Sequence, residues 1–172
     1  MDWNPEYYTK RIMVFGCGNV LLGDDGLGPA VTEHLAQKYT IPPDVCVVNI
    51  GTSIREILFD LILMEKRPER IVIIDAVDHS DQGRKPGEIF EIVLEEVPEK
   101  KMSDFSLHLS PTTNLLKELR DLGHIDVRII ACQVESIPQE ITGGLSRPVQ
   151  AAVPQVSKLI QERYFNNKKE NK

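Results

Sequence analysis

The chain has 172 residues, of which 41% are hydrophobic and 27% charged, and its formal net charge is −6. A chain of this length and composition can bury a sizeable core, so we expect residues 1–172 to form a single domain. The acidic balance argues against nucleic acid or an anionic membrane as a partner. No apolar run approaches the roughly 20 residues of a membrane span, and the first residues lack the basic and apolar parts of a secretory signal.

The cysteines indicate a reducing compartment. Cys17, Cys46 and Cys132 lie far apart in the sequence and include no C-x-x-C pair. Neither a disulfide framework nor a zinc knuckle is therefore indicated, and we expect a cytoplasmic protein.

Apolar runs and amphipathic stretches alternate along the chain. Between a polar lead-in at 1–10 and a flexible polar tail at 166–172, strands are predicted at 11–15, 45–50, 71–74, 87–94 and 126–134, and helices at 26–39, 54–64, 111–122 and 149–165. The alternating residues 87–94 are typical of an edge strand, and the charged residues 95–106 of a surface loop. This order predicts an α/β fold, a three-layer αβα sandwich around a twisted, mostly parallel sheet of about five strands.

A glycine-rich loop at 16–28 joins the first strand to the first helix and carries two adjacent carboxylates, Asp24 and Asp25. Ligands of open α/β sheets gather at the carboxyl ends of strands, so we place the working site here. The loop is not a nucleotide loop, because Leu21 stands where G-x-G-x-x-G needs its third glycine and no Gly-Lys-Ser/Thr follows. The acids suit a metal ion or an acid/base pair. We expect one of them to N-cap the helix.

Smaller roles are predicted for the other residues of this loop. Gly18, Gly23 and Gly26 would allow tight turns and close approach of a substrate. Asn19 would hold Asp25 or orient an oxyanion, and a turn-forming role is an equal alternative.

Four positions outside the acidic pair also invite a chemical interpretation. Asp75 follows the most continuously apolar run of the chain, so its carboxylate must be satisfied by a ligand or by hydrogen bonds from the loop. His108 precedes a helix and is either a ligand or an ordinary surface histidine, with His79 as its substitute. Cys17 could be a nucleophile, but the nearby acids oppose a thiolate, and we expect it to pack beneath the loop.

Together these residues resemble one known family. The pattern G-C-G-N-V-L-L-G-D-D-G-L-G at 16–28, the Asp-Ala pair at 75–76, the histidine before a helix and Gly-Leu-Ser at 144–146 are similar to the hydrogenase maturation endopeptidases. The likeness runs from about residue 11 to 160. The segment around His108 is most similar to the methanogen branch that processes the deazaflavin-coenzyme-reducing hydrogenase.

The resemblance implies an endopeptidase that removes a short C-terminal extension from the precursor of a nickel-iron hydrogenase large subunit. Cleavage would follow nickel insertion and fall after a His or Arg. The family's metal-contacting positions fall on Asp25, Asp75 and His108, with Asp25 where some members carry Glu. The implied nickel comes with the substrate rather than as a tightly held cofactor.

Two mechanisms remain open at this stage. Nickel would polarise the scissile carbonyl or activate a water, or Asp25 or Asp75 would be the general base, with nickel only a recognition signal. A protein substrate further predicts a groove beside the strand ends rather than a closed pocket. The alternative class is a non-enzymatic module, either a nickel chaperone or a flavodoxin-like binder. A flavodoxin-like binder would favour an acid at the end of the second strand, where this chain has Asn49.

Overall fold

The computed structural model describes residues 9–92, 94, 113–121 and 123–166. Its five-stranded sheet has the order β2-β1-β3-β5-β4, with parallel pairing throughout except for β4, which runs antiparallel to β5. The strands are β1 (Ile12–Cys17), β2 (Val45–Gly51), β3 (Arg70–Val77), β4 (Ile89–Ile92) and β5 (Asp126–Gln133). The predicted mostly parallel sheet with an edge strand near residue 90 is therefore confirmed.

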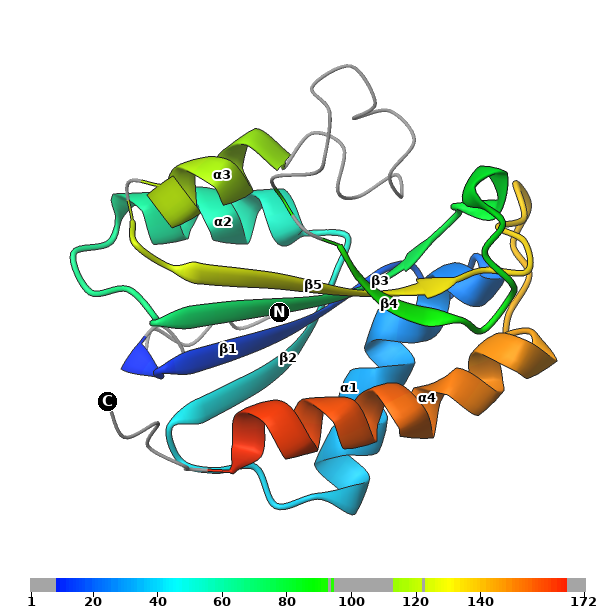
Figure 1. Cartoon of the computed structure of the whole chain (residues 1–172), viewed down its shortest axis with the longest axis horizontal. Helices are drawn as coiled ribbons and strands as arrows, with labels where there is room; N and C mark the ends of the chain where they lie inside the picture. The colour runs from blue at the N-terminus through cyan, green and yellow to red at the C-terminus, as the bar shows by residue number, and fades with distance from the viewer. Residues whose placement is uncertain (1–8, 93, 95–112, 122, 167–172) are drawn as a thin grey trace.

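Two helices cover each face of this sheet (Figure 1). They are α1 (Leu27–Lys38), α2 (Ile54–Leu63), α3 (Thr113–Asp121) and α4 (Arg147–Ile160), which continues in one π turn, Gln161–Phe165. The pair α1 and α4 lies on one face, and the pair α2 and α3 lies on the other. None of the described helices is long and apolar enough to cross a membrane.

The apolar pattern explains why the layers form. Alternate residues of β1 point to opposite faces, so that Met13 and Phe15 belong to the core beneath α2 and α3, while Ile12 and Val14 belong to the core beneath α1 and α4. Every residue of β3 from Ile71 to Val77 is buried, as expected for a strand covered on both sides. The sheet is thus the shared wall of two cores.

Three strands run further than predicted, β2 by the single residue Gly51 and β1 and β3 by more. Pairing with β2 extends β1 to Cys17, so the glycine-rich loop begins only at Gly18. Pairing with β5 extends β3 to Val77, so Asp75 lies within the strand, opposite Ala131, and not in the loop after it. The predicted loop at 95–106, most of the lead-in and most of the tail lie outside the described residues.

Candidate active site

Asp25 lies in a single 3-10 turn, Gly23–Gly26, between β1 and α1. Its side chain is buried, and its Oδ2 accepts a hydrogen bond of 2.7 Å from the backbone N–H of Asn19. The side chain of Asn19 accepts instead from the backbone N–H of Leu21, at 3.0 Å, and so forms a turn. Asn19 therefore holds Asp25 through its main chain and shapes the loop through its side chain.

Gly18 is the position where the loop requires glycine. Its φ of +125° is unfavourable for other residues, and a Cβ there would lie 1.8 Å from the carbonyl oxygen of Asp25. Gly23 also has a positive φ, +58°, whereas Gly26 has φ −73°. The chain thus turns back over the end of β1 and brings Asp25 against it.

Asp75 lies near the carboxyl end of β3, and Cys17 is the last residue of the neighbouring strand β1. Asp75 is fully buried, and its Oδ1 accepts a 2.9 Å hydrogen bond from the backbone N–H of Ala76. Burial raises the pKa of the Cys17 thiol well above its ordinary value, and the carboxylates of Asp75 and Asp25 raise it further. Both acids are therefore close enough to act on Cys17, which is itself fully buried. The expectation that Cys17 packs is confirmed, since it belongs to the core beneath α2 and α3.

Asp24 has a different surrounding from its neighbour Asp25. Its carboxylate accepts hydrogen bonds from the backbone N–H groups of Glu135 at 2.8 Å, Ser136 at 3.4 Å and Ser146 at 2.7 Å, and from the Ser146 hydroxyl at 2.9 Å. All four donors belong to the segment between β5 and α4. Asp24 thus ties the turn that carries Asp25 to a segment more than a hundred residues away.

The expectation that one of the two acids N-caps the first helix is wrong. The N-cap residue of α1 is Gly26, and no side chain caps the helix. The 3-10 turn separates the acids from α1. The Asp24 carboxylate accepts its hydrogen bonds from the segment between β5 and α4 instead.

The role of the segment 135–146 was missed by the sequence reasoning. It also binds the glycine-rich loop through its backbone, since Gly23 N–H donates to the Thr142 carbonyl at 2.7 Å and Thr142 N–H donates to the Leu21 carbonyl at 2.9 Å. The one available signal is Gly-Leu-Ser at 144–146, whose serine is a donor to Asp24. The two loops form one unit at the carboxyl edge of the sheet.

Of the two candidate histidines, the structure describes only His79. His108 lies outside the described residues. His79 is largely buried, and its ring centroid lies 5.5 Å from that of Phe90, while its backbone N–H donates to Gln133 Oε1 at 2.7 Å. Within the described part of the chain, no three His, Cys, Asp or Glu side chains are grouped so as to hold a metal ion. The predicted set of Asp25, Asp75 and His108 therefore stays a prediction.

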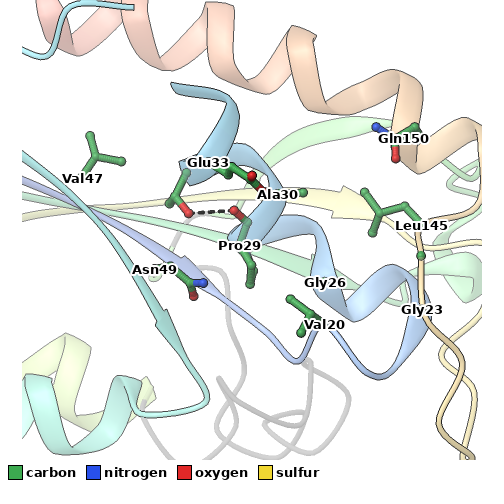
Figure 2. A pocket seen from close by; sticks show the side chains of 12 residues that line it. Val20, Gly23, Gly26, Pro29, Ala30, Glu33, Val47, Asn49, Leu145 and Gln150 are labelled. Carbon is green, nitrogen blue, oxygen red and sulfur yellow. Dashed lines mark hydrogen bonds between the residues drawn. The ribbon is translucent and has the colours of Figure 1, made fainter. Parts of the chain in front are cut away.

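An open cavity of about 520 Å³ lies over the first turns of α1 (Figure 2). Its walls come from three places: the glycine-rich loop, β2 with Val47 and Asn49, and the junction into α4 with Leu145 before the helix and Gln150 in it. Gly23 and Gly26 line it, but neither Asp25 nor Asp75 does. The described residues thus include an open groove at the predicted edge, next to the acids rather than around them.

Comparison with known proteins identifies the family. A family model described as hydrogenase maturation protease matches residues 29–163. The chain is 35% identical over 152 residues to a candidate hydrogenase maturation protease of Methanocaldococcus jannaschii, covering 88% of this chain and 94% of that one. It is 31% identical over 157 residues to the coenzyme F420 hydrogenase subunit delta of Methanothermobacter thermautotrophicus, covering 89% and 94%, in line with the expected methanogen branch. The solved structure of the hydrogenase maturating endopeptidase HybD from E. coli matches with a TM-score of 0.71 and 27% identity, over 88% of this chain and 90% of that one. This chain belongs to the hydrogenase maturation protease family and is a peptidase.

Proposed function

We propose that this peptidase removes the C-terminal extension from the precursor of a nickel-iron hydrogenase large subunit, after nickel has been inserted. The observation that carries the proposal is the pair of buried carboxylates, Asp25 and Asp75, around the end of β1 in a chain of this family. Residues 1–172 act as a single peptidase domain. The free, buried state of Cys17, Cys46 and Cys132 supports a reducing, cytoplasmic setting.

In this proposal Asp25 and Asp75 are the catalytic residues, and together with His108 they contact the nickel that arrives with the substrate. Burial strengthens the electrostatic action of both carboxylates, because water screens them little. The Asn19 N–H fixes the Asp25 side chain in place before the substrate arrives. Such fixed acids suit a metal-assisted hydrolysis, in which the substrate's nickel polarises the scissile carbonyl.

The rival mechanism uses the same residues differently. Asp25 or Asp75 would take a proton from the attacking water, and nickel would only signal that the precursor is ready. Both mechanisms need a carboxylate at this edge of the sheet, and both accept a protein chain through the open groove beside it.

The test is mass spectrometry of an unprocessed large-subunit precursor after incubation with this protein. We expect loss of a C-terminal peptide from the nickel-loaded precursor, and an unchanged mass for the same precursor without nickel. Cleavage of both samples would support the proposed peptidase activity and contradict the proposed requirement for nickel. Intact mass in both samples, across several hydrogenase precursors, would overturn the proposed function.

A further inference from the structure

Three exposed apolar side chains gather at the rim of the carboxyl edge. Val20, Leu21 and Ile141 are 56%, 50% and 76% exposed, and the other large apolar side chains exposed in the described chain, Phe59 and Leu63, lie on α2. The backbone pairing of residues 21–23 with Thr142 holds the two rim segments side by side. Exposed apolar groups brought together in this way are typical of interaction surfaces.

The rim continues into the groove over α1. Val20 belongs to both, and a Cβ at Gly26 would lie 3.2 Å from Val20 Cα and 3.7 Å from Leu145 Cδ2, so the absence of a side chain keeps the floor open. In Figure 2, Ala30 and Glu33 lie between β2 on one side and the start of α4 on the other. The groove is therefore open, and apolar side chains line it together with the polar side chains of Thr32, Asn49 and Gln150.

Among the described residues that line this groove, Glu33 is the one with an ionisable side chain. It is exposed and accepts a hydrogen bond of 3.0 Å from Gln37 Nε2. No lysine or arginine of the described residues forms an ion pair with it. An exposed acid of this kind complements a cationic group on a partner and repels an anionic one.

The groove is also fixed in position. The same turn that forms its end, Gly23–Gly26, is anchored by the four hydrogen bonds to Asp24. A partner that binds here therefore loses little free energy to the ordering of the loops. That turn also carries Asp25, although the Asp25 side chain does not line the groove.

From these observations we infer that the groove over α1 is an exosite for the protein substrate, which occupies it with a segment carrying one cationic and at least one apolar side chain. The cationic group faces Glu33, and the apolar one packs between Val20 and Leu145. The inference rests on the proposed function and adds to it the surface that selects the substrate. Nucleic acid does not fit, because Glu33 and the net charge of −6 would repel it.

Steady-state processing of the nickel-loaded precursor tests the exosite with two pairs of variants. Ala30→Phe fills the groove, and its control, Ala36→Phe, adds the same bulk at an exposed position of the same helix. Glu33→Lys reverses the charge, and its control, Glu56→Lys, does so on the exposed face of α2. We expect KM to rise about tenfold for Ala30→Phe and Glu33→Lys with kcat nearly unchanged, because binding is lost equally in the ground and transition states.

A high salt concentration separates the electrostatic contribution of Glu33 to substrate binding from the packing contribution of the groove. At about 1 M salt, exposed charges are screened within roughly 3 Å, so the KM of Glu33→Lys should approach that of wild type while Ala30→Phe keeps its defect. If the wild type cleaves the precursor but each variant has the same KM as its control, the exosite is overturned and the proposed function is not. A wild type that leaves every precursor intact would instead overturn the proposed function, and the exosite with it.

Site-specific cross-linking gives a second readout that does not depend on turnover. Burial raises the pKa of Cys46 to about 11 and of Cys132 to about 12, and that of Cys17 is also raised, so a new surface cysteine is the one that a thiol reagent labels. Ala30→Cys carrying a photo-cross-linker should capture the precursor, and Phe59→Cys on α2 should not. Equal capture at both positions would contradict the exosite.

Discussion

The carboxylates at the two edges of the parallel sheet differ in their burial and in their hydrogen-bond partners. At the amino edge, acids meet arginines: Arg11 Nε lies 2.8 Å from Asp44 Oδ2, and Arg70 Nε lies 2.6 Å from Asp126 Oδ2. These side chains are about a third exposed. At the carboxyl edge, Asp24, Asp25 and Asp75 are almost completely buried and accept hydrogen bonds from backbone N–H groups.

This difference in burial indicates different roles for the two sets of acids, in stability at the amino edge and in chemistry at the carboxyl edge. A solvated carboxylate–arginine pair costs little to form and contributes little, commonly below about 1 kcal/mol. A buried carboxylate loses its hydration, so the fold must supply donors aimed at it. Among the described acids, those at the carboxyl edge are the ones held buried and fixed by backbone donors, an arrangement that suits catalysis on a peptide bond.

The largest effect should come from the two acids nearest Cys17. Asp25→Asn and Asp75→Asn each remove a charge with almost no change of shape, and we expect each to slow processing at least a hundredfold. The measurement is the rate of C-terminal cleavage by mass spectrometry, with thermal melting to confirm that the variants fold. Asp126→Asn at the amino edge is the matched control and should process at the wild-type rate. Undiminished cleavage by Asp25→Asn would remove that residue from both mechanisms.

The next effect should be on stability, at Asp24. Asp24→Ala leaves three partly buried backbone donors of the segment 135–146 without their acceptor, which should cost about 3 kcal/mol and lower Tm by roughly 6–12 °C. Ser146→Ala removes one hydroxyl donor while the Asp24 carboxylate keeps its backbone donors, and should cost about 1 kcal/mol. A Tm for Asp24→Ala equal to that of Ser146→Ala would show that the tie between the two loops is weak.

Local patterns in the sequence were enough to predict the sheet and the place of the site. The apolar run 71–74 marks a strand buried on both faces, and the glycines and acids of 16–28 mark the loop at its carboxyl edge. Contacts between distant segments were not predictable. One of the two acids of the loop was expected to cap the first helix because capping is local, whereas the donors to Asp24 at Glu135 and Ser146 lie 111 and 122 residues away. The carboxyl end of β3 differs from the predicted one for the same reason, because pairing with the distant strand β5 determines where β3 ends.

The smallest effect should come from the amino edge, through pH. Burial tends to raise the pKa of Asp126, but hydrogen bonds from Arg70 and Arg128 outweigh it and hold that pKa below its ordinary value. Because the folded pKa is the lower one, the ionised carboxylate stabilises the fold above the ordinary value of about 3.9, and this stabilisation is lost as the pH falls through the folded pKa.

Asp126→Asn should therefore lower the free energy of unfolding by at most about 1 kcal/mol at pH 7, since the pair is partly solvated. Urea melts of both proteins at several pH values should show this difference shrinking toward zero below about pH 3.9, where the wild-type carboxylate gains its proton. A difference that stays constant into acid would mean that Asp126 acts through its shape and hydrogen bonds rather than its charge. The amino edge would then resemble the carboxyl edge more closely than its ion pairs indicate.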